Sequence, residues 1–387
     1  MIGLARSGRA AADALERRLV EVVRADRDLG NDADPALLDG VGLIVKSPGV
    51  PAENRLVASA RERALPVWSE LELGYRLLDG ARIVAVTGTN GKTTTAELLG
   101  AMLGAPVAGN VGRALTDLDG RVEPGEWVVV EVSSFQLEDI HDFRPRIAVL
   151  LNLEPDHLDR HGSFEAYRAA KLRVFENQTR EDTAVVPRGF SAVPGAAARI
   201  EFDAGDELPA EPLIRGEHNR ENAAAATAAA RAAGLDDARI GEALRTFPGV
   251  PHRLELVAEV GGVRYVNDSK ATNVAAARRA LAAYADEPVH LIVGGSRKGE
   301  DFRPLADAIG PNVKRVYLIG ETAAELRDLV PVHVPAGDLA TAVGRASAEA
   351  EPGDVVLLAP AAASYDQFRD FEHRGEEFRR LVKNLGG

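Results

Sequence analysis

The sequence of 387 residues contains no cysteine, which excludes disulfides, thiolate metal sites and thiol nucleophiles. It also lacks any run of about 18 uninterrupted apolar residues, the length a membrane-spanning helix needs, and no basic start precedes an apolar run. Basic residues are in deficit, because 46 Lys and Arg stand against 59 Asp and Glu, a formal charge of −13. That balance argues against nucleic acid or membrane binding through bulk charge. We therefore expect a cytoplasmic protein with no nucleic-acid or membrane partner, and, as a separate expectation, a monomer.

What the sequence does contain is an alternation of apolar, β-branched runs with amphipathic stretches. Continuous apolar strands that alternate with helices indicate parallel sheets covered on both faces, so the predicted fold class is α/β. The alanine-dense run 223–233 is predicted to be a tightly packed helix. The other predicted helices are 93–103, 164–177, 274–284 and 339–350, and the predicted strands are 42–46, 82–86, 127–132, 147–151, 263–266, 290–293, 316–319 and 355–358.

Two joints in the chain are predicted domain boundaries. A helical pattern ends at Gly80 and a strand follows, and two prolines flank Gly249 between a helix and the next strand. The predicted domains are 1–80, 81–249 and 250–387. Their lengths, roughly 80, 170 and 140 residues, all lie in the usual range for a domain.

The most informative segment follows the strand at 82–86 and reads T-G-T-N-G-K-T-T. A strand, a Gly-containing loop and a helix that opens with Lys-Thr form the usual cradle for a polyphosphate, with Mg²⁺ held by a hydroxyl. The common pattern has a glycine where this chain has Val86, so the loop is a shortened variant. A mere connecting turn is the alternative interpretation. The predicted ATP-binding residues are Gly88, Asn90, Gly91, Lys92, Thr93 and Thr94, with Thr93 also a metal ligand.

Polar side chains also follow two later strands. Glu131 interrupts an apolar strand near its carboxyl end, where α/β sheets bind ligands, and a buried carboxylate there favours a bound cation. After the strand at 147–151 come Asp156 and His157, which could coordinate a metal or act as acid and base. Lys171 lies on an amphipathic helix, where a lysine is ordinarily solvated. A phosphate loop with these residues does not by itself separate an enzyme from a nucleotide-driven switch.

Together these segments resemble the Mur ligase family, ATP-dependent amide-forming enzymes of peptidoglycan synthesis. The family shows the same T-G-T-N-G-K-T loop, E-x-S-S-F-Q strand end, N-x-x-x-D-H-x-D strand end and R-A-A-K-L helix. Three further segments resemble the members that add D-glutamate to UDP-N-acetylmuramoyl-L-alanine. They are V-P-H-R-L-E at 250–255, N-D-S-K-A-T-N at 267–273 and S-Y-D-Q-F-R-D-F-E-H-R-G at 364–375.

The resemblance implies three domains: a Rossmann-like first domain for UDP, a P-loop domain for ATP and Mg²⁺, and a Rossmann-like third domain for D-glutamate. It implies two magnesium ions and a carbamylated Lys171, with Lys92, His157 and Lys171 as catalytic residues. The metal ligands would be Thr93, Glu131, His157 and Lys171, and further ATP contacts would come from Asn219, Asn222, Arg253 and Asp268. The muramoyl part would contact Asn110, Ser133 and Gln136, and D-glutamate would contact Thr272, Lys298, Ser364 and Phe371.

The N-terminus departs from the family pattern. The chain opens M-I-G-L-A-R-S-G, so the first strand is either unusually short or begins upstream. We expect UDP contacts from Arg6, Ser7, Asp26 and Gly49, with Asp26 ending a strand-like stretch at 22–25. The rival functions are another amide ligase of the superfamily, a sibling Mur ligase or a folylpolyglutamate synthase-like enzyme, and a nucleotide switch without ligase activity.

Overall fold

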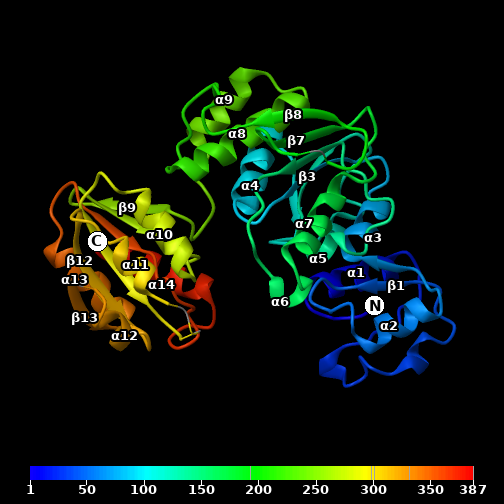
Figure 1. Cartoon of the computed structure of the whole chain (residues 1–387), viewed down its shortest axis with the longest axis horizontal. Coiled ribbons are helices and arrows are strands. Elements are labelled where there is room, and N and C mark those ends of the chain that lie inside the picture. Colours follow the sequence, from blue (N-terminus) through cyan, green and yellow to red (C-terminus); the bar gives the residue numbers. More distant parts are fainter. Residues whose placement is uncertain (192, 298, 300, 331, 387) are drawn as a thin grey trace. The chain divides into compact units, whose positions relative to one another are not determined.

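The computed structural model describes residues 1–191, 193–297, 299, 301–330 and 332–386. The chain forms two compact units (Figure 1). The first comprises Met1–Pro212 and His218–Phe247, and the second comprises Leu213–Glu217 and Pro248–Gly387. Each unit contains a six-stranded sheet, and the first unit has an additional two-stranded sheet. The α/β fold class predicted from the sequence is confirmed.

The large sheet of the first unit is parallel throughout, in the order β4-β5-β3-β6-β7-β8. Its central strands were predicted because their interiors are continuously apolar, as those of strands covered on both faces are. The short β4 and the last two strands were not predicted. The strands are β3 (Arg82–Thr87), β4 (Val107–Gly109), β5 (Trp127–Glu131), β6 (Ile147–Leu150), β7 (Thr183–Pro187) and β8 (Ala198–Phe202).

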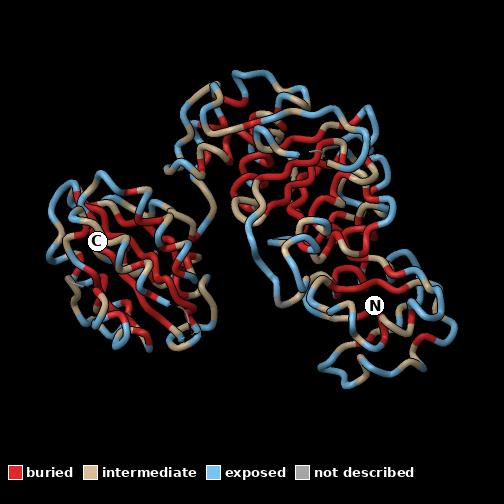
Figure 2. The backbone as a smooth tube through the Cα atoms, viewed as in Figure 1, coloured by how far each residue is buried: buried red, intermediate tan, exposed pale blue. Residues whose placement is uncertain are grey.

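Helices cover this sheet and bury its strands, which Figure 2 shows as the buried centre of the unit. One face packs against apolar residues of α3, η3, α5 and α7, in a single core. The alanine-rich α8 buries small side chains along its length, as predicted. The helices are α4 (Lys92–Leu103), α5 (Ser134–Leu137), α6 (Leu158–His161), α7 (Phe164–Leu172), α8 (Glu217–Ala232) and α9 (Asp237–Thr246), with the 3₁₀ turns η3 (Leu115–Leu118) and η4 (Arg173–Phe175).

The first eighty residues form a small sheet of two parallel strands, β1 (Ile44–Lys46) and β2 (Val67–Ser69). Ile2 adds one residue of pairing, because it bridges both Lys46 and Ala25. The prediction of a strand at 22–25 is wrong, because Ala25 alone forms a bridge, and its partner is the single residue Ile2. The helices here are α1 (Arg6–Arg17), α2 (Arg55–Glu62) and α3 (Glu70–Leu77), with the 3₁₀ turns η1 (Arg27–Leu29) and η2 (Pro35–Leu38).

The sheet of the second unit has the order β13-β12-β11-β14-β10-β9, and it is parallel except for β9. Gly261 and Gly262, with φ of +61° and +77°, form the two-residue turn between β9 and β10. Apolar cores lie on both faces of the sheet. The elements are β9 (Glu255–Val260), β10 (Val263–Asn267), β11 (Val289–Gly294), β12 (Val313–Ile319), β13 (His333–Gly337), β14 (Val355–Leu358), α10 (Val274–Ala282), α11 (Arg303–Asp307), α12 (Ala323–Arg327), α13 (Leu339–Glu349) and α14 (Phe371–Lys383).

Candidate active site

A Gly-containing loop joins β3 to α4 at the carboxyl edge of the central sheet. Gly91 is the last loop residue, at φ +83°, and α4 starts at Lys92. A Cβ added at Gly91 would meet the end of the Asn222 side chain, and the positive φ is one that other residues rarely adopt, so this position favours glycine. The strand, loop and helix follow in the order that the sequence predicted. Thr93 and Thr94 lie buried in the first turn of α4, at the positive end of the helix.

Hydrogen bonds inside the loop hold its shape. Lys92 Nζ donates to the carbonyl oxygens of Gly88 at 3.0 Å and Thr89 at 2.9 Å. Asn152, at the end of β6, accepts from Asn90 N–H through Oδ1 at 2.8 Å and from Thr89 N–H through its carbonyl at 3.0 Å. Sequence reasoning assigned Asn152 no role. Its position could have suggested one, because β6, like β3, is a buried strand that polar residues follow directly.

Glu131 lies at the carboxyl end of β5 and is 2% exposed. Because β5 lies between β4 and β3, Glu131 is on an interior strand of the sheet and not on an edge strand. Asn110 donates through Nδ2 to Glu131 Oε1 at 2.9 Å, so the structure brings these two predicted residues together. The sequence places no cation beside it in β5, and a buried carboxylate whose side-chain contact is a neutral amide favours a cation as ligand.

Ser133 and Gln136 begin the short helix α5 immediately after β5. Ser133 Oγ accepts from the backbone N–H of Gln136 at 3.3 Å, and Gln136 Oε1 accepts from the backbone N–H of Ser133 at 3.0 Å. This reciprocal pair is a capping box, which fixes both side chains at the start of the helix. The two predicted residues therefore lie together, one turn beyond Glu131.

Lys171 is the clearest departure from what its sequence environment suggests. It is 2% exposed, and Nζ donates to the Gly88 carbonyl at 2.8 Å and lies 4.7 Å from the centre of the Tyr167 ring. Burial, and then the charge of Lys92, lower the pKa of Lys171 from 10.5 to about 7. The expectation of an ordinary solvated lysine is wrong, because α7 turns this residue toward the phosphate loop.

His157 lies on the loop between β6 and α6, with a left-handed φ of +51° and an exposed side chain. Its Nε2 is 3.6 Å from Asp156, and its ring centre is 4.9 Å from that of Phe135. Asp156 and Glu131 both act to raise the pKa of Lys171, so these two carboxylates lie within electrostatic reach of its amine.

Asn219 and Asn222 lie one turn apart on α8 and are both buried. Asn222 Nδ2 donates to Asn219 Oδ1 at 3.3 Å, and Asn222 also packs against Gly91. The structure thus brings these two predicted residues to the phosphate loop.

The residues expected to contact UDP surround the start of α1. Arg6 is the first residue of that helix, and Ser7 Oγ lies 3.1 Å from Ser47 Oγ, two residues before the exposed Gly49. The Asp26 carboxylate accepts hydrogen bonds from the backbone N–H groups of Leu4 and Asp28, which lower its pKa. Arg6 also donates to the Asn110 carbonyl at 3.3 Å, which links this group to the end of the central sheet.

The remaining predicted residues belong to the second unit. Asp268 is buried at the end of β10, and burial raises its pKa from 3.8 to about 7, against the lowering effect of Leu254 N–H and Arg253. Ser364 is buried, and Phe371 begins α14 with Lys270 Nζ 3.7 Å above its ring. Thr272 is half-buried in the loop after β10, and Lys298 lies outside the described residues.

Arg374, a residue without a predicted role, joins the two loops that carry these residues. Its guanidinium is fully buried and donates to Ser269 Oγ at 3.0 Å and to the Ser269 carbonyl at 2.9 Å. It also donates to the carbonyls of Ala362 at 3.1 Å and Ala363 at 3.2 Å. The burial of Arg374 could not be predicted from neighbouring residues, because its partner Ser269 lies 105 residues away in the sequence.

Two family models match the chain, the Mur ligase middle domain over residues 86–194 and the Mur ligase, glutamate ligase domain over residues 252–362. The UDP-N-acetylmuramoylalanine--D-glutamate ligase of Acidobacterium capsulatum is 41% identical, over 99% of this chain and 95% of that protein. The chain belongs to the Mur ligase family. The protein of the same name from Anaeromyxobacter dehalogenans is 44% identical, over 99% of this chain and 96% of its own length.

Solved structures confirm the Mur ligase fold at lower identity. UDP-N-acetylmuramate-alanine ligase MurC from Thermotoga maritima matches with a TM-score of 0.64 and 20% identity, over 99% of this chain and 98% of that one. The FolC protein of E. coli, in complex with DHPP and ADP, matches with a TM-score of 0.60 and 19% identity, over 81% and 92%. At these identities the similarity concerns the fold alone.

The donors in this Mur ligase suit a hard cation with few protein ligands. Among the described residues no group of three His, Asp or Glu side chains converges. Mg²⁺ typically takes one or two carboxylates and otherwise phosphates and water. The buried Glu131 at the carboxyl end of β5 and the buried hydroxyls of Thr93 and Thr94 in the first turn of α4 are donors of that kind.

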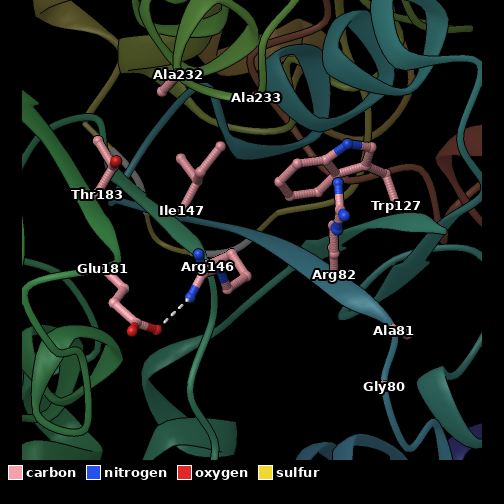
Figure 3. A pocket seen from close by; sticks show the side chains of 10 residues that line it. All are labelled: Gly80, Ala81, Arg82, Trp127, Arg146, Ile147, Glu181, Thr183, Ala232 and Ala233. Atoms are coloured by element: carbon pink, nitrogen blue, oxygen red, sulfur yellow. Dashed lines mark hydrogen bonds and ion pairs between the residues drawn. The ribbon is translucent and has the colours of Figure 1, made fainter. Parts of the chain in front are cut away.

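A groove lies at the opposite, amino end of the same sheet (Figure 3). Its two adjoining cavities have volumes of about 470 and 500 Å³. Arg146 points at Glu181 across 3.4 Å, while Trp127 lies beside Arg82, with 5.7 Å from the guanidinium carbon to the ring centre. Since its acids and bases are largely paired with one another, we assign no ligand to the groove. None of the described helices is long and apolar enough to cross a membrane.

Proposed function

We propose that this Mur ligase joins D-glutamate to UDP-N-acetylmuramoyl-L-alanine, with conversion of ATP to ADP and phosphate. The observation that carries the proposal is end-to-end identity of about 40% with several proteins named UDP-N-acetylmuramoylalanine--D-glutamate ligase. The reaction belongs to cytoplasmic synthesis of peptidoglycan precursors, and we expect the enzyme to act there as a monomer.

We assign one substrate to each domain. Residues 1–80 would bind the UDP end, 81–249 would bind ATP, and 250–387 would bind D-glutamate. The N-terminus of α1, the phosphate loop and the loops joined by Arg374 support this division, because each provides polar groups at the carboxyl ends of parallel strands.

The chemistry must activate a carboxylate, which is a poor acylating agent. The alanyl carboxylate attacks the γ-phosphorus of ATP, the bond to the β-phosphate oxygen breaks, and an acyl phosphate and ADP result. The D-glutamate amine then attacks the acyl carbon, loses a proton and expels phosphate from a tetrahedral intermediate. Every reactant is anionic, so the chain contributes mainly positioning and charge neutralisation by Lys92 and the loop amides.

The metal would be held where the buried carboxylate and hydroxyl donors lie. We assign Thr93, Glu131, His157 and Lys171 as ligands of two Mg²⁺ ions, whose contribution when bound is to neutralise phosphate charge. A lysine can serve only as a carbamate. CO₂ adds to the neutral amine with loss of one proton, and the low pKa of Lys171 favours that neutral form.

The other substrate contacts follow from the same placement. For the nucleotide we assign Gly88, Asn90, Gly91, Lys92, Thr93, Thr94, Asn219, Asn222, Arg253 and Asp268. For the UDP substrate we assign Arg6, Ser7, Asp26, Gly49, Asn110, Ser133 and Gln136. For D-glutamate we assign Thr272, Lys298, Ser364 and Phe371, since hydroxyls and a cation suit a dicarboxylate.

The test is phosphate release with UDP-N-acetylmuramoyl-L-alanine, ATP, Mg²⁺ and one amino acid at a time. We expect release with D-glutamate and none with L-glutamate, L-lysine or diaminopimelate. Release with L-lysine or diaminopimelate alone would instead identify a sibling ligase, and ATP hydrolysis indifferent to the UDP substrate would identify a switch. A dihydropteroate substrate in place of the UDP substrate tests for a folylpolyglutamate synthase.

A further inference from the structure

Glu138 lies where three segments of the first unit meet. It follows α5 directly, and its side chain is 22% exposed. Arg173 fixes the backbone around it, because its guanidinium donates to the carbonyls of Leu137 at 2.8 Å and Ile140 at 2.9 Å, and to that of Glu138 itself. The carboxylate is therefore presented from a rigid stretch of chain.

One group that Glu138 reaches comes from β1. Lys46 is fully buried, and its Nζ is 3.5 Å from Glu138 Oε2 and 2.8 Å from Asp139 Oδ2. Lys46 directly precedes the turn at 47–50, which contains Gly49. Asp139 also pairs with Arg61 at 2.8 Å, so Lys46 keeps one carboxylate partner even without Glu138.

The other groups come from α6. Arg160 Nη2 lies 3.5 Å from Glu138 Oε2, and His161 Nδ1 lies 3.7 Å from Glu138 Oε1. Arg160 also donates to the Val50 carbonyl at 3.1 Å, so it touches the same turn that Lys46 precedes. His161 is held from its other side, since Nε2 lies 3.0 Å from Ser134 Oγ.

These contacts determine where His157 points. The helix α6 is a single turn, and the backbone N–H groups of Arg160 and His161 both donate to the His157 carbonyl, at 3.1 and 3.0 Å. The exposed side chain of His157 contacts Asp156 and the Phe135 ring, while its backbone, at a left-handed φ, is bound by the turn that follows. Because Arg160 and His161 are anchored and both donate to the His157 carbonyl, they also fix the backbone of His157.

We propose that Glu138 is a positioning residue that couples the turn at 47–50 to the orientation of His157. The inference rests on the proposed function, in which that turn contacts UDP and His157 holds Mg²⁺. Glu138 touches neither substrate. By holding Lys46 and Arg160 together, it lets a UDP-substrate seated on the turn favour the arrangement of α6 that catalysis needs.

The test is steady-state kinetics of the full-length enzyme with Glu138→Gln, which keeps the size of the side chain and removes its charge. We expect the KM for UDP-N-acetylmuramoyl-L-alanine and the Mg²⁺ concentration for half-maximal rate each to rise about tenfold, with the KM for D-glutamate unchanged within twofold. Glu138→Asp should recover part of the loss. Glu181→Gln, which removes a carboxylate paired with Arg146 at the far end of the same sheet, is the matched control and should change nothing.

Two results would overturn the proposal. In one, Glu138→Gln leaves both quantities within twofold of the parent enzyme. In the other, it lowers the melting temperature and raises all three apparent constants equally, and Glu138→Asp recovers nothing, which is the behaviour of a purely structural ion pair. If the parent enzyme does not use D-glutamate, the proposed function fails, and calorimetric binding of UDP-N-acetylmuramoyl-L-alanine to the Glu138→Gln protein then decides whether Glu138 affects the turn.

Discussion

Lys171 should react with CO₂ near neutral pH, where an ordinary lysine is almost entirely protonated. Its pKa is lowered to about 7 by burial and by Lys92. At pH 7 about half of the Lys171 amines are then neutral, against roughly one in 2,500 for a lysine with a pKa near 10.4. Since only the neutral amine attacks CO₂, the structure raises the reactive fraction by about a thousandfold.

The assay follows the ¹³C carbamate signal of CO₂-depleted enzyme after addition of labelled bicarbonate, as an initial rate divided by the dissolved CO₂ concentration. That rate should rise with pH and reach half its plateau near pH 7, because the amine loses its proton there. It should fall below pH 6, where the amine is protonated. A half-plateau near pH 10, or the same signal in Lys171→Ala, would refute the reasoning.

The same residue has a kinetic consequence. Lys171→Ala should abolish turnover, and added formate or acetate should restore part of it by supplying a carboxylate in the space left by the side chain. Full activity of the alanine variant would show that the carbamate has no role.

Three further perturbations have expected results. Gly91→Ala should weaken nucleotide binding at least about tenfold by calorimetry, or ~1.4 kcal/mol, because the new methyl meets Asn222. Gly112→Ala, also at positive φ (+72°) but with open space around it, should leave binding within twofold, and equal losses would contradict the steric explanation. Arg374→Ala should lower the unfolding free energy of the full-length chain by about 3 kcal/mol in urea, since buried carbonyls lose their donor; a loss below about 1 kcal/mol would contradict this. Asp268 binds ATP as a carboxylate in our proposal, so the KM for ATP should rise as pH falls below about 7, and the Asp268→Asn profile should be flat.

The parts of the fold that could be predicted are those that local sequence determines. Strands such as β5, β6 and β11 are mostly apolar because both faces are covered, and this pattern is visible in a short window. β8 is largely exposed and carries charged residues, and β4 has only three residues, so neither shows that pattern. The stretch at 22–25 has β-branched residues, which favour strands, but it pairs through one residue only. Without a neighbouring strand to pair with, it does not form a strand.

The candidate site divides in the same way. The phosphate loop could be predicted because its glycine, lysine and threonine spacing acts within one turn of chain. For Lys171 the role was predicted only through the resemblance to the family, since its burial against Gly88, 83 residues away in the sequence, leaves no local pattern. The contacts of Glu138 with Lys46 span 92 residues, and no local pattern records them.

The second unit is built from two separate pieces of chain, and this limits how it can be exchanged between relatives. Leu213–Glu217 belongs to it although α8 and α9 follow before the chain re-enters at Pro248. Within that short piece, Arg215 pairs with Glu287 and lies over the Tyr284 ring. A chimera with a single junction at Pro248 would take residues 213–217 from one parent and the rest of the second unit from the other. The contacts of Arg215 with Glu287 and Tyr284 would then join residues from different parents. Recombination of whole functional modules in this protein therefore needs the short piece transplanted as well, or a junction placed before Leu213.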